Sequence, residues 1–167
     1  MAVLDGGYRS WREAGKPAEA GLSCPTVSEL YPLRLTGSLR AEVQAVEKAV
    51  MRAGATLLDG RSQAQFDGRE KSPQVVRAGD LPGAVHLDHN GAFQPGTGRL
   101  RPIAELEQLF EPVPLGPVIS YCNAGHLAST NWFVLSEVLK CPAITLYDGS
   151  MSEWTQDPGR PVATNAS

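Results

Sequence analysis

Four short runs of apolar and β-branched residues are spaced along the chain from residue 55 onward, separated by polar and turn-forming positions. The runs are residues 55–59, 84–87, 118–121 and 143–147. Runs of this length that contain Val, Ile, Thr and Tyr are typical of buried strands. The segments between them are too long for hairpins, so we expect a mostly parallel sheet with helices on both faces.

Ahead of and between these runs, apolar residues return at intervals of three and four, which predicts amphipathic helices. The first helix is expected from an N-cap at Ser38 to about Met51. Its apolar positions are Leu39, Val43, Val46 and Val50. A short helix is expected to end near Phe66, because Ser62 and Gln65 have the spacing of a capping box.

Two longer helices are expected in the second half of the chain. One begins at Pro102, and its inward positions are predicted to be Ile103, Leu106 and Phe110. The other follows a turn at 123–126, and its apolar face is predicted to carry Trp132, Leu135 and Leu139. The polar segment 67–82 is expected to lie on the surface.

The two ends of the chain resemble each other. Residues 3–17 read VLDGGYRSWREAGKP and residues 146–161 read LYDGSMSEWTQDPGRP. In each, an Asp-Gly pair is followed by a Trp (Trp11, Trp154) and then by Gly, a basic residue and Pro. We interpret both as a DG turn, a short helix with an inward Trp and a Gly-x-Pro exit.

This internal repeat suggests a domain organisation. The second copy closes a run of strands and helices, whereas the first copy has none ahead of it. We therefore expect residues 1–20 to be the C-terminal remnant of a preceding domain, and 21–38, rich in Gly, Pro and Ser, to be a linker. Residues 39–163 form the main domain and 164–167 a tail.

The composition narrows the classes of partner and location. The chain has 167 residues, 42% of them hydrophobic and 20% charged, enough to bury a core. A formal net charge of -3 and scattered basic residues argue against nucleic-acid or membrane-surface partners. No apolar run reaches the roughly 20 residues of a membrane span, and the N-terminus does not resemble a secretory signal. A cytoplasmic location is expected, although a periplasmic one stays open.

The cysteines are Cys24, Cys122 and Cys141, and the histidines are three in number. Neither set has the spacing of a disulfide framework or of a metal site, so we expect no metal and no cofactor.

Cys122 stands where the strand 118–121 ends and a turn leads into a helix. Backbone N–H groups in such a turn have no intrahelical partner, and they favour an anion. A thiol placed there should ionise more easily and act as a nucleophile. The alternative interpretation is that Cys122 is a small buried apolar residue, as most free cysteines are.

Five segments together resemble the rhodanese (sulfurtransferase) family, and in particular the second domain of tandem rhodaneses. They are LLDGRS at 57–62, GDLPGAVHL at 79–87, SYCNAGHLAS at 120–129, WFVLSEVL at 132–139 and LYDGSMSEW at 146–154. The resemblance implies an α/β, rhodanese-like fold with a central, mostly parallel sheet of about five strands and helices on both faces. It also identifies residues 1–20 with the end of the family's first domain.

The resemblance implies sulfur transfer from thiosulfate or 3-mercaptopyruvate to cyanide or a thiol. Cys122 is then the catalytic residue that carries a persulfide. The persulfide-stabilising loop is Asn123, Ala124, Gly125, His126, Leu127 and Ala128. Arg69, Arg77 and His126 are the candidates for substrate contacts, and Asp59 with Arg61 is expected to form a structural ion pair.

The sequence also departs from the family pattern. Many rhodanese loops carry Arg, Lys or Thr where this chain has His126 and Leu127, and the usual Gly-His is Gly79-Asp80 here. His126 can supply charge or a proton, or can simply hydrogen-bond at the rim.

Two other functions are alternatives to sulfur transfer for this chain. A phosphatase-type enzyme needs an Arg six residues after the cysteine, where this chain has Ala128. A non-catalytic rhodanese-like module that binds or regulates a partner remains the main alternative. In the absence of the first domain, the surface that this domain would cover is exposed. That exposure favours self-association, and Trp11 is a candidate contact residue.

Overall fold

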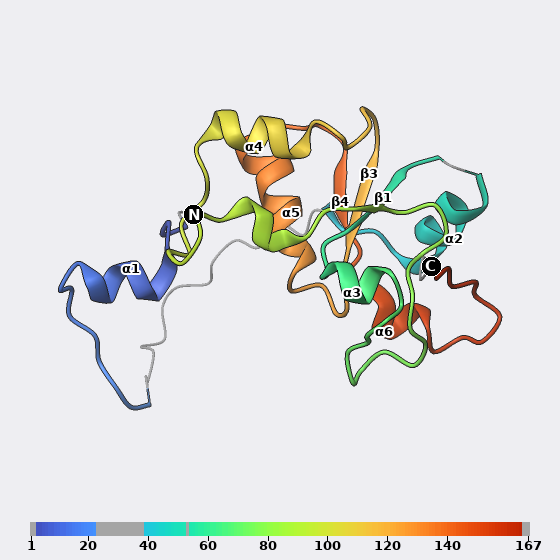
Figure 1. The fold of residues 1–167 in the computed structure, drawn as a ribbon, viewed down its shortest axis with the longest axis horizontal. Coiled ribbons are helices and arrows are strands. Elements are labelled where there is room, and N and C mark those ends of the chain that lie inside the picture. The colour runs from blue at the N-terminus through green and yellow to red at the C-terminus, as the bar shows by residue number, and fades with distance from the viewer. Residues whose placement is uncertain (1–2, 23–38, 53, 165–167) are drawn as a thin grey trace, which may run out of the picture.

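A parallel sheet forms the centre of the molecule in the computed structural model, which describes residues 3–22, 39–52 and 54–164. Its strands are β1 (Thr56–Asp59), β2 (Val85–His86), β3 (Val118–Tyr121) and β4 (Ile144–Leu146), in the order β2-β1-β3-β4 (Figure 1). All the pairings are parallel. The predicted strands and their parallel arrangement are confirmed, with four strands in place of about five.

The predicted start of the first helix is wrong, because the chain there pairs with the edge strand β4. Helix α2 runs Val43–Arg52, so it begins four residues later than Leu39. The residues before it are extended, because Arg40 forms a parallel bridge with Leu146 and Ala41 N–H donates to the Leu146 carbonyl at 2.9 Å. Leu39 is 48% exposed as a result. The N-cap predicted at Ser38 and most of the predicted linker lie outside the described residues.

The remaining helices follow the predicted order along the chain. They are α1 (Gly7–Glu13), α3 (Gln63–Phe66), η2 (His89–Ala92), α4 (Ile103–Phe110), α5 (Ala128–Phe133), η3 (Val134–Val138) and α6 (Ser150–Trp154). Ser62 caps α3 by accepting from Gln65 N–H, as expected. α5 continues directly into η3, where the hydrogen bonding widens to a π pattern, with Leu139 N–H donating to the Val134 carbonyl.

Helices cover both faces of the sheet, as the strand pattern predicted (Figure 1). Side chains of α2 and α6 pack on one face with Leu57 and Ile119, and side chains of α4 and η3 pack on the other with Leu58 and Val118. Neighbouring strand residues therefore point to opposite faces.

One expectation about burial is wrong, and the segment 67–82 lies at the surface as expected except at a few anchoring residues. Ile103 is 59% exposed, whereas Leu106 and Phe110 of the same helix are buried. In the segment 67–82, Val75 and Leu81 are buried against the core and anchor the excursion to the domain.

The N-terminal segment packs on the domain through its DG turn, and α1 projects from the body (Figure 1). The Asp5 carboxylate accepts from Leu100 N–H at 2.9 Å. Trp11 Nε1 donates to the Pro17 carbonyl at 2.7 Å, and Trp154 Nε1 donates to the Pro161 carbonyl at 2.8 Å. The two ends of the chain therefore share this hydrogen bond from the Trp ring to the Pro carbonyl, but Trp154 is buried and Trp11 is 37% exposed.

Within the described residues, no helix has the length and apolar character needed to span a bilayer. The same part of the chain contains no cluster of three His, Cys, Asp or Glu side chains placed to hold a metal ion.

Candidate active site

Cys122 follows the last residue of β3, at the carboxyl edge of the sheet. It is a free thiol and only 1% exposed. It belongs to neither of the two clusters of packed hydrophobic side chains. Its burial agrees with the alternative of a small core residue, and its position directly before the turn between β3 and α5 agrees with the nucleophile.

The carbonyl groups of this turn, residues 122–128 (the Cys122 loop), all accept hydrogen bonds from the protein. The donors are Met151 N–H to Cys122, Ser152 N–H to Asn123, the His126 ring to Ala124, Ser129 N–H to Gly125, Ser129 Oγ to His126, Thr130 N–H to Leu127 and Ser120 Oγ to Ala128. Six of the seven loop carbonyls thus bind residues outside the loop, and the Ala124 carbonyl binds the His126 ring within it.

The N–H groups of the same loop behave differently. Across the described residues, the amides of Asn123, Ala124, His126, Leu127 and Ala128 have no acceptor. In a trans peptide the N–H points opposite to the preceding carbonyl, so carbonyls that are bonded outward turn the next amides inward. Successive free amides of this kind form a concavity that binds an anion.

Gly125 allows the loop to turn. Its φ is 80°, in the left-handed region, and a Cβ there would lie 3.0 Å from Asp148 Cα. A side chain is therefore excluded by both the backbone conformation and the neighbouring chain.

Sequence reasoning missed two side chains that hold the loop. Ser150 Oγ accepts from Cys122 N–H at 3.0 Å and from Gly125 N–H at 3.1 Å. Gln65 Oε1, on α3, accepts from Asn123 Nδ2 at 2.9 Å. Both residues are distant from Cys122 in sequence, and only the repeat and the capping box had drawn attention to them.

The ion pair expected next to the site is present and buried. Arg61 Nη2 lies 2.6 Å from Asp59 Oδ2, with the two side chains 1% and 0% exposed. Burial lowers the pKa of Arg61, but the hydrogen bonds and charge of Asp59 outweigh it and raise the pKa overall. Arg61 also donates to the Gly79 carbonyl at 2.8 Å, so the pair ties the end of β1 to the segment ahead of β2.

Tyr121, directly before Cys122, belongs to the same buried polar group. Its hydroxyl accepts from Leu81 N–H at 3.2 Å. Burial raises the pKa of Tyr121 well above its ordinary value, and the Asp59 charge acts in the same direction. The Tyr121 phenol therefore stays neutral and has a structural role beneath the loop.

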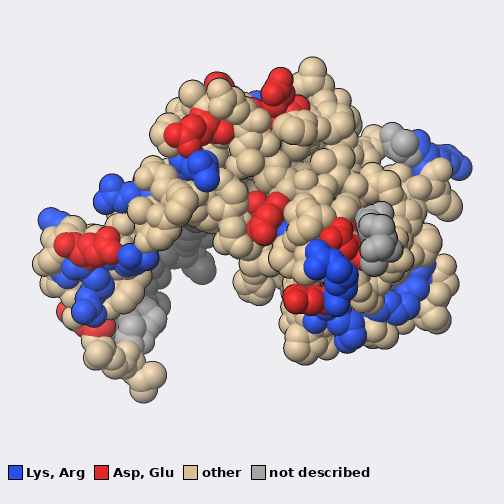
Figure 2. Space-filling view, viewed as in Figure 1, with Lys and Arg blue, Asp and Glu red and all other residues tan. Residues whose placement is uncertain are grey.

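Of the three candidates for substrate contacts, His126 lies on the Cys122 loop and the two arginines lie elsewhere. His126 is exposed on the loop, with Nδ1 3.1 Å from the Ala124 carbonyl oxygen. Arg69 is paired with Asp67 at 2.8 Å, and Arg77 donates to the Asp157 carbonyl at 2.8 Å. Neither arginine contacts the Cys122 loop in the described structure. Figure 2 shows acidic side chains among the basic ones near α3 and α6.

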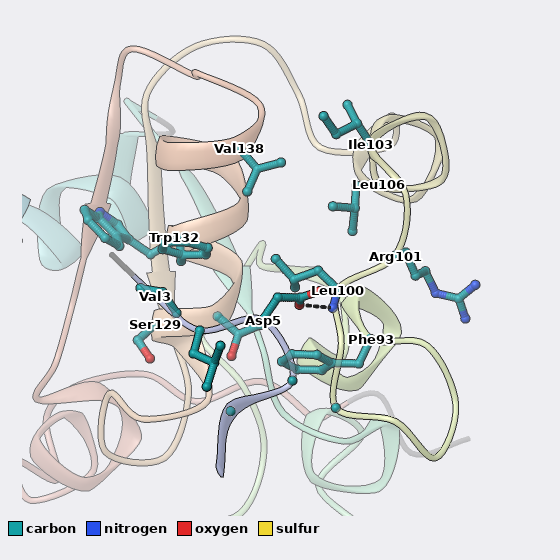
Figure 3. A pocket seen from close by; sticks show the side chains of 16 residues that line it. Val3, Asp5, Phe93, Leu100, Arg101, Ile103, Leu106, Ser129, Trp132 and Val138 are labelled. Carbon is teal, nitrogen blue, oxygen red and sulfur yellow. Dashed lines mark hydrogen bonds between the residues drawn. The ribbon is translucent and has the colours of Figure 1, made fainter. Parts of the chain in front are cut away.

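A cavity of about 810 Å³ lies beside the loop rather than at the thiol (Figure 3). The N-terminal segment 3–7 closes it on one side, and Phe93, Leu100, Trp132 and Val138 supply apolar walls. Ser129, from the first turn of α5, is its link to the loop, because Ser129 Oγ donates to the His126 carbonyl.

Curated relatives of this chain include named sulfurtransferases. The chain is 35% identical over 173 residues to a probable 3-mercaptopyruvate sulfurtransferase of Pseudomonas aeruginosa, covering 97% of this chain and 57% of the relative. It is 31% identical over 175 residues to a thiosulfate sulfurtransferase of Corynebacterium glutamicum, covering 98% and 57%. The chain therefore spans little more than half the length of these relatives.

Solved structures show the same fold. The Tum1 protein of Saccharomyces cerevisiae matches with a TM-score of 0.81 at 21% identity, covering 97% of this chain and 60% of Tum1. An anaerobic ergothioneine biosynthesis enzyme of Chlorobium limicola, in complex with trimethyl histidine, matches with a TM-score of 0.83 at 22% identity, covering 98% and 41%.

The family model described as a rhodanese-like domain matches residues 42–157, more than half of the chain. That range contains the parallel sheet, the Cys122 loop and the helices on both faces, which agrees with the resemblance found in the sequence. The chain therefore belongs to the rhodanese-like family.

Proposed function

We propose that this chain transfers a sulfane sulfur atom through a persulfide on Cys122. The observation that carries the proposal is the polarity of the Cys122 loop, whose carbonyl groups are bonded outward while most of its amides have no acceptor. Amides that are fixed in this way stabilise negative charge without having to reorganise. A thiolate and a persulfide anion are the charges that a cysteine in this loop can carry.

In the first half-reaction the Cys122 thiolate attacks the outer sulfur of the donor. With thiosulfate, an S–S bond to Cys122 forms, the S–S bond of the donor breaks, and sulfite leaves with the bonding electrons. With 3-mercaptopyruvate, the C–S bond breaks, and the departing carbon takes up the proton of the donor thiol to give pyruvate. Each route leaves a persulfide anion on Cys122.

In the second half-reaction cyanide or a thiolate attacks the outer sulfur of the persulfide. The S–S bond breaks, its electrons return to Cys122, and thiocyanate or a new persulfide leaves. No oxidant, reductant or cofactor enters either step. Reactions of a free thiolate suit a reducing compartment such as the cytoplasm.

Contacts to an anionic donor are assigned to His126, Arg69 and Arg77 in that order. His126 is exposed on the loop itself. Arg69 binds the Asp67 carboxylate and Arg77 donates to the Asp157 carbonyl, and each guanidinium keeps further N–H groups for an anionic donor. The names of the relatives from Pseudomonas aeruginosa and Corynebacterium glutamicum, a 3-mercaptopyruvate and a thiosulfate sulfurtransferase, support both donors.

Intact-mass measurement tests the proposal. Incubation with thiosulfate or 3-mercaptopyruvate should add one sulfur atom, and cyanide should remove it and release thiocyanate. Cys122→Ser should abolish the gain, whereas the matched control Cys141→Ser should retain it. Absence of a mass gain with both donors, or a gain that persists in Cys122→Ser, would contradict the proposal.

A further inference from the structure

The Ser150 hydroxyl connects α6 to the Cys122 loop, and it makes all the hydrogen bonds that a hydroxyl can make. The residue is 0% exposed. Its Oγ accepts from the amides of Cys122 and Gly125, and it donates to the Tyr147 carbonyl at 2.8 Å. A serine hydroxyl has one proton and two lone pairs, so all of its hydrogen-bonding capacity is in use.

The backbone of Ser150 adopts a conformation that serine disfavours. Its φ is 51°, in the left-handed region that glycine tolerates best. The corresponding residue of the first DG segment is Gly7, whose φ is 56°. The two DG turns differ at their glycines, since φ is 81° at Gly6 and -58° at Gly149, but both place a left-handed residue at the next position. That residue is a glycine in the first segment and a serine in the one beside Cys122. The turn alone does not account for the serine, whereas the contacts of its hydroxyl do.

The contacts around Ser150 also orient the neighbouring amides. Met151 N–H and Ser152 N–H bind the carbonyls of Cys122 and Asn123 at 3.1 and 2.9 Å. The amides that follow these carbonyls, those of Asn123 and Ala124, therefore point away from α6. Ser150 Oγ fixes the amides on either side of this pair, at Cys122 and Gly125.

We propose that Ser150 is a positioning residue that keeps the free amides of the Cys122 loop directed at the Cys122 sulfur. The inference rests on the proposed function, because it concerns the charge that the loop stabilises. Without the Ser150 oxygen, the peptide groups at Cys122 and Gly125 lose their anchor, and the amides between them lose their fixed orientation.

Alkylation of Cys122, followed at that residue by peptide mass spectrometry, tests the role. Ser150→Ala and Ser150→Gly should each lower the rate at pH 7 about tenfold, because the attacking thiolate loses oriented amides; a tenfold change in rate corresponds to about 1.4 kcal/mol. The rates of the variants and of the unaltered chain should converge as the pH is raised. The matched control Ser136→Ala removes a hydroxyl that donates to Glu137 Oε1 on η3 and takes no part in holding the Cys122 loop, and it should match the unaltered chain.

Stability measurements distinguish a positioning role of Ser150 from a purely structural one. Ser150→Gly relieves the left-handed strain, so its urea midpoint should lie above that of Ser150→Ala. If the hydroxyl acts on the loop, both variants lose the same reactivity at pH 7 despite this difference. Alkylation at the rate of the unaltered chain in Ser150→Gly would overturn the proposal.

Amide hydrogen exchange provides a test that needs no variant. In the unaltered chain, the amides of Cys122 and Gly125 should exchange more slowly than those of Asn123 and Ala124, and equal rates would overturn the proposal. These measurements also remain separate from the sulfur-transfer assay. A chain that gains no sulfur but shows the expected alkylation pattern would contradict the proposed function and leave the role of Ser150 standing.

Discussion

At the scale of single residues, the Asp59–Arg61 pair shows how the sequence places a charge in the interior. The two side chains are 0% and 1% exposed, and Arg61 makes three contacts with the Asp59 carboxylate in addition to its bond to Gly79. Burying either ion alone costs several kcal/mol, and the pairing offsets that cost only while both partners are present.

Arg61→Ala should therefore lower the free energy of unfolding by about 3–5 kcal/mol, because it leaves the Asp59 carboxylate buried and unpaired. Urea unfolding measures the loss. The matched control is Arg69→Ala, which removes an arginine from an ion pair in which its own side chain is 56% exposed. Its effect should stay within about 1 kcal/mol. Similar small losses in both variants would show that water reaches Asp59.

The same scale shows what the sequence can predict about the site. Cys122, Gly125 and the Asp59–Arg61 pair were predictable because each lies in a short segment whose local chemistry identifies it. Ser150 and Gln65 were not, since they reach the loop from 28 and 58 residues away. A hydroxyl at a turn and an amide in a capping box have ordinary local explanations, and only the fold brings them to Cys122.

At the scale of elements, strands were predicted more accurately than helix boundaries. The central strands β1 and β3 are mostly buried apolar runs, and burial on both faces leaves little freedom in their position. The edge strands β2 and β4 are partly exposed and shorter than predicted. The start of α2 was misplaced because Leu39 fits the helical period, but the chain there gains a bridge to β4 instead. Sheet pairing depends on residues that are distant in sequence, and the spacing of apolar residues within one segment does not predict it.

Helix α4 allows a direct test of which apolar positions carry stability. Leu106 is 1% exposed and Ile103 is 59% exposed, although both fit the apolar face of the helix. Leu106→Ala should cost about 2–5 kcal/mol, because it leaves a cavity in the core. Ile103→Ala should change the free energy of unfolding by only about 0.5 kcal/mol. Thermal or urea unfolding compares the two, and equal losses would place Ile103 in the core.

At the scale of the whole molecule, the two copies of the terminal repeat differ in burial. Trp154 and Met151 of α6 are buried in the core on one face of the sheet. The matching residues of α1, Trp11 and Tyr8, are 37% and 65% exposed. The chain also spans only 57% of the length of its sulfurtransferase relatives. We therefore propose residues 1–20 as the end of a preceding domain and 39–163 as the rhodanese domain.

The exposed apolar residues of the N-terminal segment predict that the chain associates with a second copy of itself. Val3, Leu4 and Tyr8 are 54–68% exposed and lie close together in sequence with Trp11. Apolar surface concentrated on one projecting element favours association, because each copy removes the other's side chains from water. Size-exclusion chromatography with light scattering should show a dimer or larger species that dissociates on dilution.

The double variant Tyr8→Ser, Trp11→Ser should be monomeric at concentrations where the unaltered chain associates, and removal of residues 1–20 should have the same effect. Met51→Ser is the matched control, since Met51 is 73% exposed on α2, away from α1, and its loss should leave the association unchanged. A monomer at every concentration would instead mean that the packing of Asp5 on Leu100 is enough to keep α1 from pairing with a second copy.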